Sequence, residues 1–325
     1  MLKLLNNCVR TNKLPTIYEL KIHNKRQFTS TVSERNVNDA ISNPASANYC
    51  FNLVRQYDYE NFLCTLLMAE KHRQSALAVR AFNVEVSKIA SIVSDDKLNT
   101  IRLKFWYDAI ENMFSTKNSK IPDHPVIKEI HLAIRDYNLN KMYFSRLVKC
   151  RERPMNRLFV TTKELEQYAE ESVSSIYYLL VKMLKCESLD VDHALSHLGK
   201  AQGIANLLRA QSRKDRSKGV CIPQETMLKH GVSQERILRN KIDDKGVQDC
   251  VFEIASVANS HLEKAKSLSS KIPRDVKPVF LPAVATERYL ERLRKCDFHL
   301  SHPQLVKRDN LLPAIFYWNY FWKKY

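Results

Sequence analysis

Glycine is the residue whose scarcity most constrains the fold of this chain. Only five of its 325 residues are glycine, whereas glycine makes up about 7% of an average protein. Nucleotide-binding parallel sheets, phosphate-binding loops, β-sandwiches and barrels all need glycine at turns and at close backbone approaches. Because 44% of the residues are hydrophobic, the chain can still form a large core. We therefore expect an all-α protein.

The spacing of apolar residues supports this expectation. From Asn48 onward they recur at three- and four-residue intervals. The pattern predicts helices over residues 48–68, 71–93, 96–115, 125–136, 139–150, 162–185, 190–212, 224–229, 233–240, 246–270, 276–295 and 310–322. We find no tandem repeat or low-complexity linker, which predicts one domain over residues 48–325. Gly199 and Gly203 lie within one helix, so another backbone is expected to approach it closely.

The N-terminal segment has the composition of a mitochondrial transit peptide. Residues 1–28 contain a single acid, Glu19, and several basic residues: Lys3, Arg10, Lys13, Lys21, Lys25 and Arg26. A basic, acid-poor start with no long apolar run is typical of such peptides, and residues 26–30 predict cleavage after Phe28. The polar residues 29–47 are expected to be a flexible linker. The alternative is a disordered basic tail on a cytosolic protein. If the segment is a transit peptide, the precursor would also form a cytosolic pool before import.

Residues 80–85 and 198–209 resemble two motifs of the squalene/phytoene synthase family. Residues 80–85, Arg-Ala-Phe-Asn-Val-Glu, resemble the start of the first aspartate motif. Residues 198–209 resemble the second motif, Leu-Gly-x-Ala-x-Gln-x-x-Asn-x-Leu-Arg-Asp. Weaker matches at 164–175 and 222–231 occur in the same order. The resemblance runs from about residue 48 to 303 and implies a single isoprenoid-synthase-like helical domain.

The chemistry of that family depends on carboxylates that this chain lacks. In the family, two Asp-x-x-x-Asp pairs on facing helices hold Mg²⁺ against a diphosphate, because Mg²⁺ prefers hard oxygen ligands. Here the aspartate positions hold Ser87 and Ser91 in the first motif, and Ala210 and Lys214 in the second. A lysine would repel a divalent cation there. The resemblance therefore implies a retained fold without the prenyl-transfer chemistry.

Other motif positions have also changed. The phosphate-binding arginine of the family corresponds to Val84 and the glutamine to Gly203, whereas Asn206 and Arg209 are kept. At 100° per residue, the changed and retained positions fall on two helix faces. We interpret these faces as a degenerate pocket formed by Arg80, Val84, Ser87, Ser91, Gly203, Asn206, Ala210 and Lys214. We expect no catalytic residue, cofactor or metal.

Other side chains offer weak substitutes for a metal site. Glu85 points away from Ser87 on its helix, and the pair Asp95–Asp96 is explained by helix capping. His193 and His197 are four residues apart, a spacing that can chelate zinc. Because no convincing third ligand accompanies them, we expect a satisfied, partly buried histidine pair.

The excess positive charge is concentrated in two clusters. They include the residues of an expected basic surface: Arg151, Arg153, Arg209, Arg213 and Arg216. These clusters are either solvated faces or a contact with an anionic surface, such as membrane lipid, RNA or an acidic client. Aromatic residues are not interleaved with them, as a stacking platform for RNA would require.

The C-terminal segment is rich in aromatic residues. Leu311–Trp322 contains Pro313, is shorter than the roughly 18 apolar residues of a spanning helix, and precedes Lys323 and Lys324. Trp and Tyr beside Lys are typical of a membrane interface. They are equally typical of a last helix that closes a core.

Within the family, the chain resembles a branch that has lost the aspartates, carries a presequence and acts in respiratory complex I assembly. Residues 52–61, 80–85 and 199–204 carry this resemblance. It implies a non-catalytic factor on the matrix side of the inner membrane. Its partners would be complex I subunits or assembly intermediates, at the early biogenesis of the membrane-arm subunit near the quinone module. The family's long apolar cavity would then hold a hydrophobic ligand or client segment. The alternatives are a divergent Mg²⁺-dependent prenyltransferase and a matrix RNA-binding factor.

Overall fold

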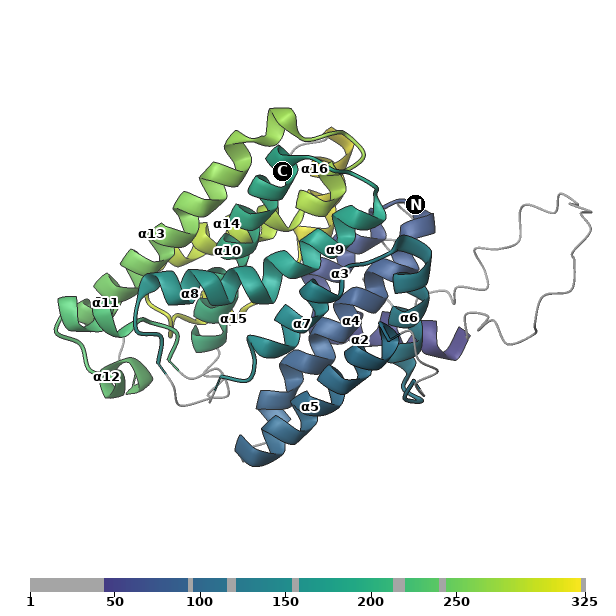
Figure 1. Cartoon of the computed structure of the whole chain (residues 1–325). Coiled ribbons are helices and arrows are strands. Elements are labelled where there is room, and N and C mark those ends of the chain that lie inside the picture. Colours follow the sequence, from purple (N-terminus) through teal and green to yellow (C-terminus); the bar gives the residue numbers. More distant parts are fainter. Residues whose placement is uncertain are drawn as a thin grey trace, which may run out of the picture. The chain divides into compact units, whose positions relative to one another are not determined.

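The computed structural model describes residues 44–92, 96–115, 121–153, 158–212, 220–239 and 244–322. Within these ranges every regular element is helical, and none is a strand (Figure 1). The α-helices are α2 Pro44–Tyr57, α3 Tyr59–Leu66, α4 Glu70–Ile92, α5 Asp96–Met113, α6 Pro125–Tyr137, α7 Lys141–Lys149, α8 Thr162–Ala169, α9 Ser175–Met183, α10 Leu189–Ser212, α11 Gln224–Lys229, α12 Gln234–Arg239, α13 Lys245–Ser267, α14 Pro282–Lys295, α15 Pro303–Val306 and α16 Leu312–Trp322. The expected all-α class is confirmed.

Three predicted helices are interrupted. The helix expected over 48–68 starts earlier, at Pro44, and breaks at Asp58, whose backbone leaves the helical region (φ −136°, ψ 52°). The helix expected over 162–185 contains a π-helical turn, η2, at Glu170–Ser174. The segment expected over 276–295 begins with a 3₁₀ turn at Lys277–Phe280 before α14. The π-helical turn and the 3₁₀ turn both pack against neighbouring helices. The short helix α15 was not among the predicted elements.

Local capping explains several helix starts. Pro125 occupies the first turn of α6, where its missing N–H costs nothing, and the His124 side chain accepts from the Val126 N–H at 3.2 Å. The Asp244 carboxylate accepts from the Val247 N–H at 3.2 Å and begins α13. Each interaction satisfies a donor that the helix leaves free at its first turn.

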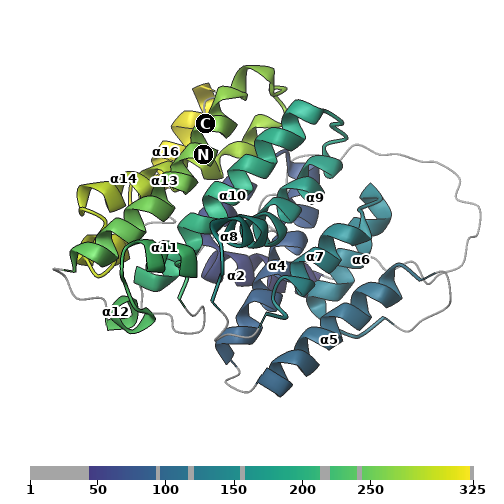
Figure 2. The ribbon, with the colours of Figure 1, turned by 60° about the vertical axis from the view of Figure 1, so that its left-hand side comes forward.

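Helices α4 and α10 carry the two motifs and lie at the centre of the packing. Helix α4 packs against α2, α6 and α9. Helix α10 packs against α8, η2, α13 and α14, and 14 of its 24 residues are buried. Helices α10 and α13 run side by side in both views (Figures 1 and 2).

The two glycines of α10 allow a close helix approach, as predicted. A Cβ atom on Gly199 would lie 1.9 Å from the Ser174 Oγ of η2. A Cβ atom on Gly203 would lie 2.6 Å from the Ala169 Cβ of α8. Neither distance is sterically tolerable, so any larger side chain would force α8 and η2 away from α10.

Several expectations fall on the undescribed residues. The transit peptide (1–28) and most of the expected linker (29–47) lie outside the described ranges, although α2 begins inside that linker. No described helix is long and apolar enough to cross a bilayer. The seven described cysteines are free thiols, and six of them are buried.

Candidate functional site

A polar cavity of about 130 Å³ lies where the two motif helices face each other. Its walls come from the α2–α3 junction, α4, η2, α9 and α10. The lining residues are Tyr57, Asp58, Asn61, Arg80, Asn83, Val84, Ser87, Val173, Ile176, Tyr177, Gln202 and Asn206. Four of the eight residues expected in a degenerate pocket are among them: Arg80, Val84, Ser87 and Asn206.

Arg80 places a buried positive charge in this cavity. Its side chain is only 2% exposed. The Nε atom donates to Thr65 Oγ1 at 2.8 Å, and Nη1 lies 4.0 Å from Asp58 Oδ2. Asp58 also accepts from Asn61 Nδ2 at 2.7 Å. Burial raises the pKa of Asp58, and the Arg80 guanidinium opposes that shift.

A chain of amide and phenol groups continues this network to α10. The Tyr177 hydroxyl donates to Gln202 Oε1, and Gln202 Nε2 donates to Asn61 Oδ1 at 3.4 Å. Burial also raises the pKa of Tyr177, so the phenol keeps its proton. The helix break at Asp58 thus connects to α10 through side-chain hydrogen bonds by way of Asn61 and Gln202, and to α4 through the ion pair with Arg80.

The donor set of this cavity does not fit a magnesium cluster. Asp58 is the single carboxylate among the described lining residues, and it already faces the Arg80 cation. The Ser87 hydroxyl donates to the Val84 carbonyl of its own helix at 3.0 Å. A fixed guanidinium repels a divalent cation most strongly in a poorly solvated site. Nowhere in the described part of the chain do three or more His, Cys, Asp or Glu side chains gather as a metal site.

The polarity of the cavity also differs from the long apolar cavity that the resemblance implied. Most of the lining side chains carry hydroxyl, amide or charged groups. The physical reason is the Arg80 charge, because a buried guanidinium needs hydrogen-bonding neighbours. A long prenyl chain therefore does not match this cavity, whereas a short polar group does.

The other four residues expected in the pocket lie elsewhere or outside the described residues. Gly203 faces Ala169 of α8 instead of the cavity, because it lies on a different side of α10 from Gln202. Ala210, one turn beyond Asn206, is half-buried and does not line the cavity. The backbone of Ser91 belongs to α4, but its side chain is outside the described part, as is Lys214.

Three arginines of the expected basic surface have internal partners. Arg151 Nη2 donates to Asn83 Oδ1 of α4 at 2.6 Å. Arg153 lies 3.2 Å from Glu164 and stacks over the Phe159 ring at 3.7 Å. Both side chains are half-buried, and their charged groups bind within the protein. They are therefore less accessible to an external partner than the sequence suggested.

Arg209, the arginine retained from the second motif, is held in the same way. Its Nη1 lies 2.8 Å from Glu60 Oε2, and its guanidinium lies over the Tyr289 ring at 4.6 Å. Its side chain is 15% exposed. Arg213 and Arg216 lie outside the described residues.

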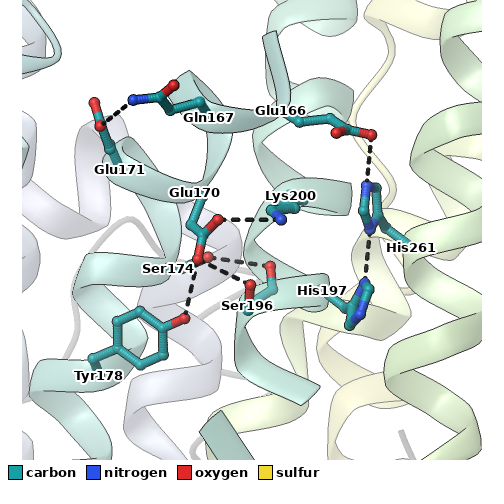
Figure 3. Close-up of polar contacts among 10 residues, drawn as sticks. All are labelled: Glu166, Gln167, Glu170, Glu171, Ser174, Tyr178, Ser196, His197, Lys200 and His261. Carbon is teal, nitrogen blue, oxygen red and sulfur yellow. Dashed lines mark hydrogen bonds and ion pairs between the residues drawn. The ribbon is translucent and has the colours of Figure 1, made fainter. Parts of the chain in front are cut away.

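The histidine pair that the structure shows joins two helices: His197 of α10 contacts His261 of α13, and both side chains are half-buried. Figure 3 shows His197 Nδ1 facing His261 Nδ1 at 2.7 Å, with His261 Nε2 bonded to Glu166 Oε1 at 3.0 Å. Burial lowers the pKa of His197, and the neighbouring His261 lowers it further. His193, four residues earlier, is exposed. The row Glu166–His261–His197 therefore joins α8, α13 and α10.

Glu170 is a second polar anchor that sequence reasoning missed. It lies in the π-helical turn, 3.2 Å from the Lys200 Nζ of α10, and accepts from Ser196 Oγ at 3.0 Å (Figure 3). Burial raises its pKa, but the Lys200 ammonium and the Ser196 hydroxyl outweigh that effect, and the net pKa is lowered. The sequence offered one indication of this contact: an acid, Glu170, and a lysine, Lys200, in two consecutive predicted helices.

Comparison with known proteins gives a consistent result. The family model for squalene/phytoene synthase matches residues 54–311. A Drosophila melanogaster protein named NADH dehydrogenase (ubiquinone) complex I, assembly factor 6 homolog is 46% identical over 300 residues, covering 91% of this chain and 90% of that protein. The Rattus norvegicus protein named complex I, assembly factor 6 is 39% identical over 283 residues, covering 87% and 84%.

Solved structures resemble the fold at much lower identity. A dehydrosqualene synthase crystallised with a ligand superposes with a TM-score of 0.71 at 17% identity, covering 85% of this chain and 95% of that one. At that identity the likeness concerns the arrangement of helices.

Proposed function

Because the chain belongs to the squalene/phytoene synthase family, in the group whose curated relatives are named complex I assembly factor 6, we propose that it is a non-catalytic assembly factor for respiratory complex I. It acts in mitochondria, on the matrix side of the inner membrane, at an early step in building the membrane arm near the quinone module. Its direct partners are complex I subunits or assembly intermediates.

The observation that carries the non-catalytic part of this proposal is the Arg80 network. Among the described residues that line the cavity between the two motif helices, one is a carboxylate, Asp58, and it is paired internally with Arg80. A synthase of this family would need paired carboxylates at that position to bind the metal ions that stabilise a leaving diphosphate. The charge and hydrogen-bonding capacity of the site are instead used within the protein.

Depletion of the protein in cells, followed by two measurements on the same mitochondria, tests the proposal. Native gel electrophoresis resolves the respiratory complexes, and extraction gives the quinone content. We expect selective loss of complex I with quinone content unchanged. Re-expression of the chain should restore complex I.

The same experiment separates the competing function. Low quinone with every quinone-using complex still assembled would show surviving prenyl chemistry and would overturn the proposal. Loss of all complexes encoded in part by mitochondrial DNA would favour a role on matrix RNA. The binding of RNA would then weaken steeply with added salt.

Photo-crosslinking tests whether the cavity contacts a client. Crosslinking amino acids at Val84 and Asn206 would report on the cavity, and one at Leu228, which is 81% exposed, is the solvent-facing control. We expect a short polar segment of a complex I subunit to be captured from the cavity positions. Capture from Leu228 alone would remove the cavity from the mechanism.

A further inference from the structure

Among the described residues, helix α16 packs against the rest of the fold through one face. Leu312 and Phe316 are buried in a small apolar cluster with side chains of α3 and the start of α14. The opposite face carries Trp318 and Phe321, which are 64% and 67% exposed. The cluster explains why α16 is folded, but it does not cover these larger aromatic side chains.

The exposed rings of α16 form a continuous aromatic patch. The Trp318 and Trp322 ring centroids are 5.7 Å apart, as are those of Phe321 and Trp322. Tyr320 is a further exposed ring, and α16 itself contains no charged residue. A contiguous exposed apolar patch of this kind is costly in water and marks an interaction surface.

Positive charge flanks the patch in the sequence. Lys307 and Arg308 precede α16, and Lys323 and Lys324 follow it. The single acid nearby, Asp309, is already paired with Arg288, whose Nε lies 2.7 Å from its carboxylate. The sequence on either side of the aromatic patch is therefore basic, and the chain as a whole carries a net charge of +17.

We propose that α16 is a membrane-docking helix that lies in the interface of an anionic lipid bilayer. Trp318, Phe321 and Trp322 enter the boundary between headgroups and acyl chains, where amphipathic rings are most stable. The basic residues that flank α16 in the sequence supply charge that anionic headgroups attract close to the surface. With eleven residues, α16 is too short to span the bilayer and lies parallel to it.

The chemistry of the patch favours lipid over a protein partner. Tryptophan flanked by lysine suits the gradient from hydrocarbon to charged headgroups, and the net charge of the chain adds long-range attraction to an anionic bilayer. The inference rests on the proposed function only for the identity of the membrane, the inner mitochondrial membrane.

Intrinsic fluorescence gives a direct test, because two of the three tryptophans of the chain are on α16. The third, Trp106, is 5% exposed and packed inside the fold. The purified chain would be mixed with phosphatidylcholine vesicles with and without cardiolipin, and with lipids brominated in their acyl chains. We expect a blue shift with cardiolipin vesicles and quenching by the brominated chains.

Two matched double variants localise the contact. Trp318→Ser/Phe321→Ser removes two exposed apolar side chains of α16, and Leu228→Ser/Leu238→Ser removes two from α11 and α12 that are 81% and 49% exposed. In vesicle sedimentation, the affinity of the first variant should be at least about tenfold lower than that of the wild type. The reason is that two large apolar side chains are no longer transferred from water into the bilayer. The second should bind like the wild type. Circular dichroism and thermal unfolding check that both variants fold.

Three results would overturn the inference. The wild type could fail to bind cardiolipin vesicles, or the α16 variant could bind as well as the wild type. Light scattering could also show a dimer that the α16 variant alone converts to monomers with vesicle binding unchanged, which would make the patch an interface between copies. Vesicle binding is measured on the purified chain, so normal complex I levels after depletion would refute the proposed function and leave this inference standing.

Discussion

At the scale of single residues, Arg80 is the side chain that most distinguishes this site from a metal centre. Its guanidinium is buried between Asp58 and Thr65, where a charge is stable only with partners in place. The removal of one member of such a pair leaves the other charge buried and uncompensated. Arg80 therefore has two roles: it stabilises the fold, and it makes the cavity electrostatically unfavourable for a metal cation.

Substitution of Arg80 tests this double role. Arg80→Met should lower the free energy of unfolding by about 3–5 kcal/mol, because Asp58 loses the cation that opposes its desolvation. Urea denaturation measures the change. The double variant Arg80→Met/Asp58→Asn removes both charges and should recover part of the loss. An Arg80→Met protein as stable as the wild type would show that the pair contributes nothing.

Histidine burial predicts how stability depends on pH. Burial lowers the pKa of four side chains: His72, His124, His131 and His197. Above the ordinary histidine pKa of about 6.5 they are neutral in both the folded and the unfolded chain. As the pH falls below that value, the unfolded chain binds protons that the folded chain resists. The free energy of unfolding should therefore decrease between about pH 7 and pH 5.

A pair of variants on α10 checks the contribution of His197. Urea denaturation across this pH range should show a shallower decrease for His197→Gln than for the wild type. His193→Gln, an exposed position on the same helix, should keep the slope of the wild type. Equal slopes for all three proteins would contradict a role for the His197–His261 contact.

At the scale of helices, α10 depends on two small residues. Gly199→Ala or Gly203→Ala places a Cβ within 1.9 Å or 2.6 Å of the facing segment. Each should lower the free energy of unfolding by about 1–3 kcal/mol, because α8 and η2 must shift. Asn206→Ala, an exposed position on the same helix, should change it by less than about 0.5 kcal/mol. A stabilising effect of either alanine would contradict the close approach.

Most helices were predictable from the sequence, whereas the irregular turns were not. The periodic apolar pattern determines a helix such as α13, because its buried face repeats every three to four residues. The break at Asp58 and the π-helical turn before Ser175 have no such local signal. Both depend on tertiary contacts: Asp58 faces Arg80 across the cavity, and Glu170 faces Lys200 of α10.

In the candidate site, the residues within the two motifs were partly predictable from the sequence, and those outside the motifs were not. The motif spacing placed Val84 and Asn206 at a shared cavity, as the structure has them. It also placed Gly203 there, whereas the structure has Gln202 at the cavity and Gly203 against Ala169. A motif position defines the direction of a side chain around the helix axis only to within about 100°, the rotation from one residue to the next. Asp58, Asn61 and Tyr177 lie outside both motifs, so their part in the cavity became visible only in three dimensions.

At the scale of the whole molecule, the fold should be indifferent to magnesium. Thermal unfolding with Mg²⁺ and inorganic diphosphate should match unfolding with a chelator, because a ligand raises the melting temperature only where it binds the folded state. An active squalene or phytoene synthase is the positive control. A melting temperature that rises with Mg²⁺ and diphosphate would show a metal site that the cavity residues do not suggest.

The buried guanidinium also bears on any attempt to build a metal site into this cavity. Ser87→Asp would introduce a carboxylate into a cavity that Arg80 and Ser87 both line, and the internal cation would compete with an external one for the new charge. A single added carboxylate would therefore not be enough, and the design of a metal site would have to begin with the replacement of Arg80.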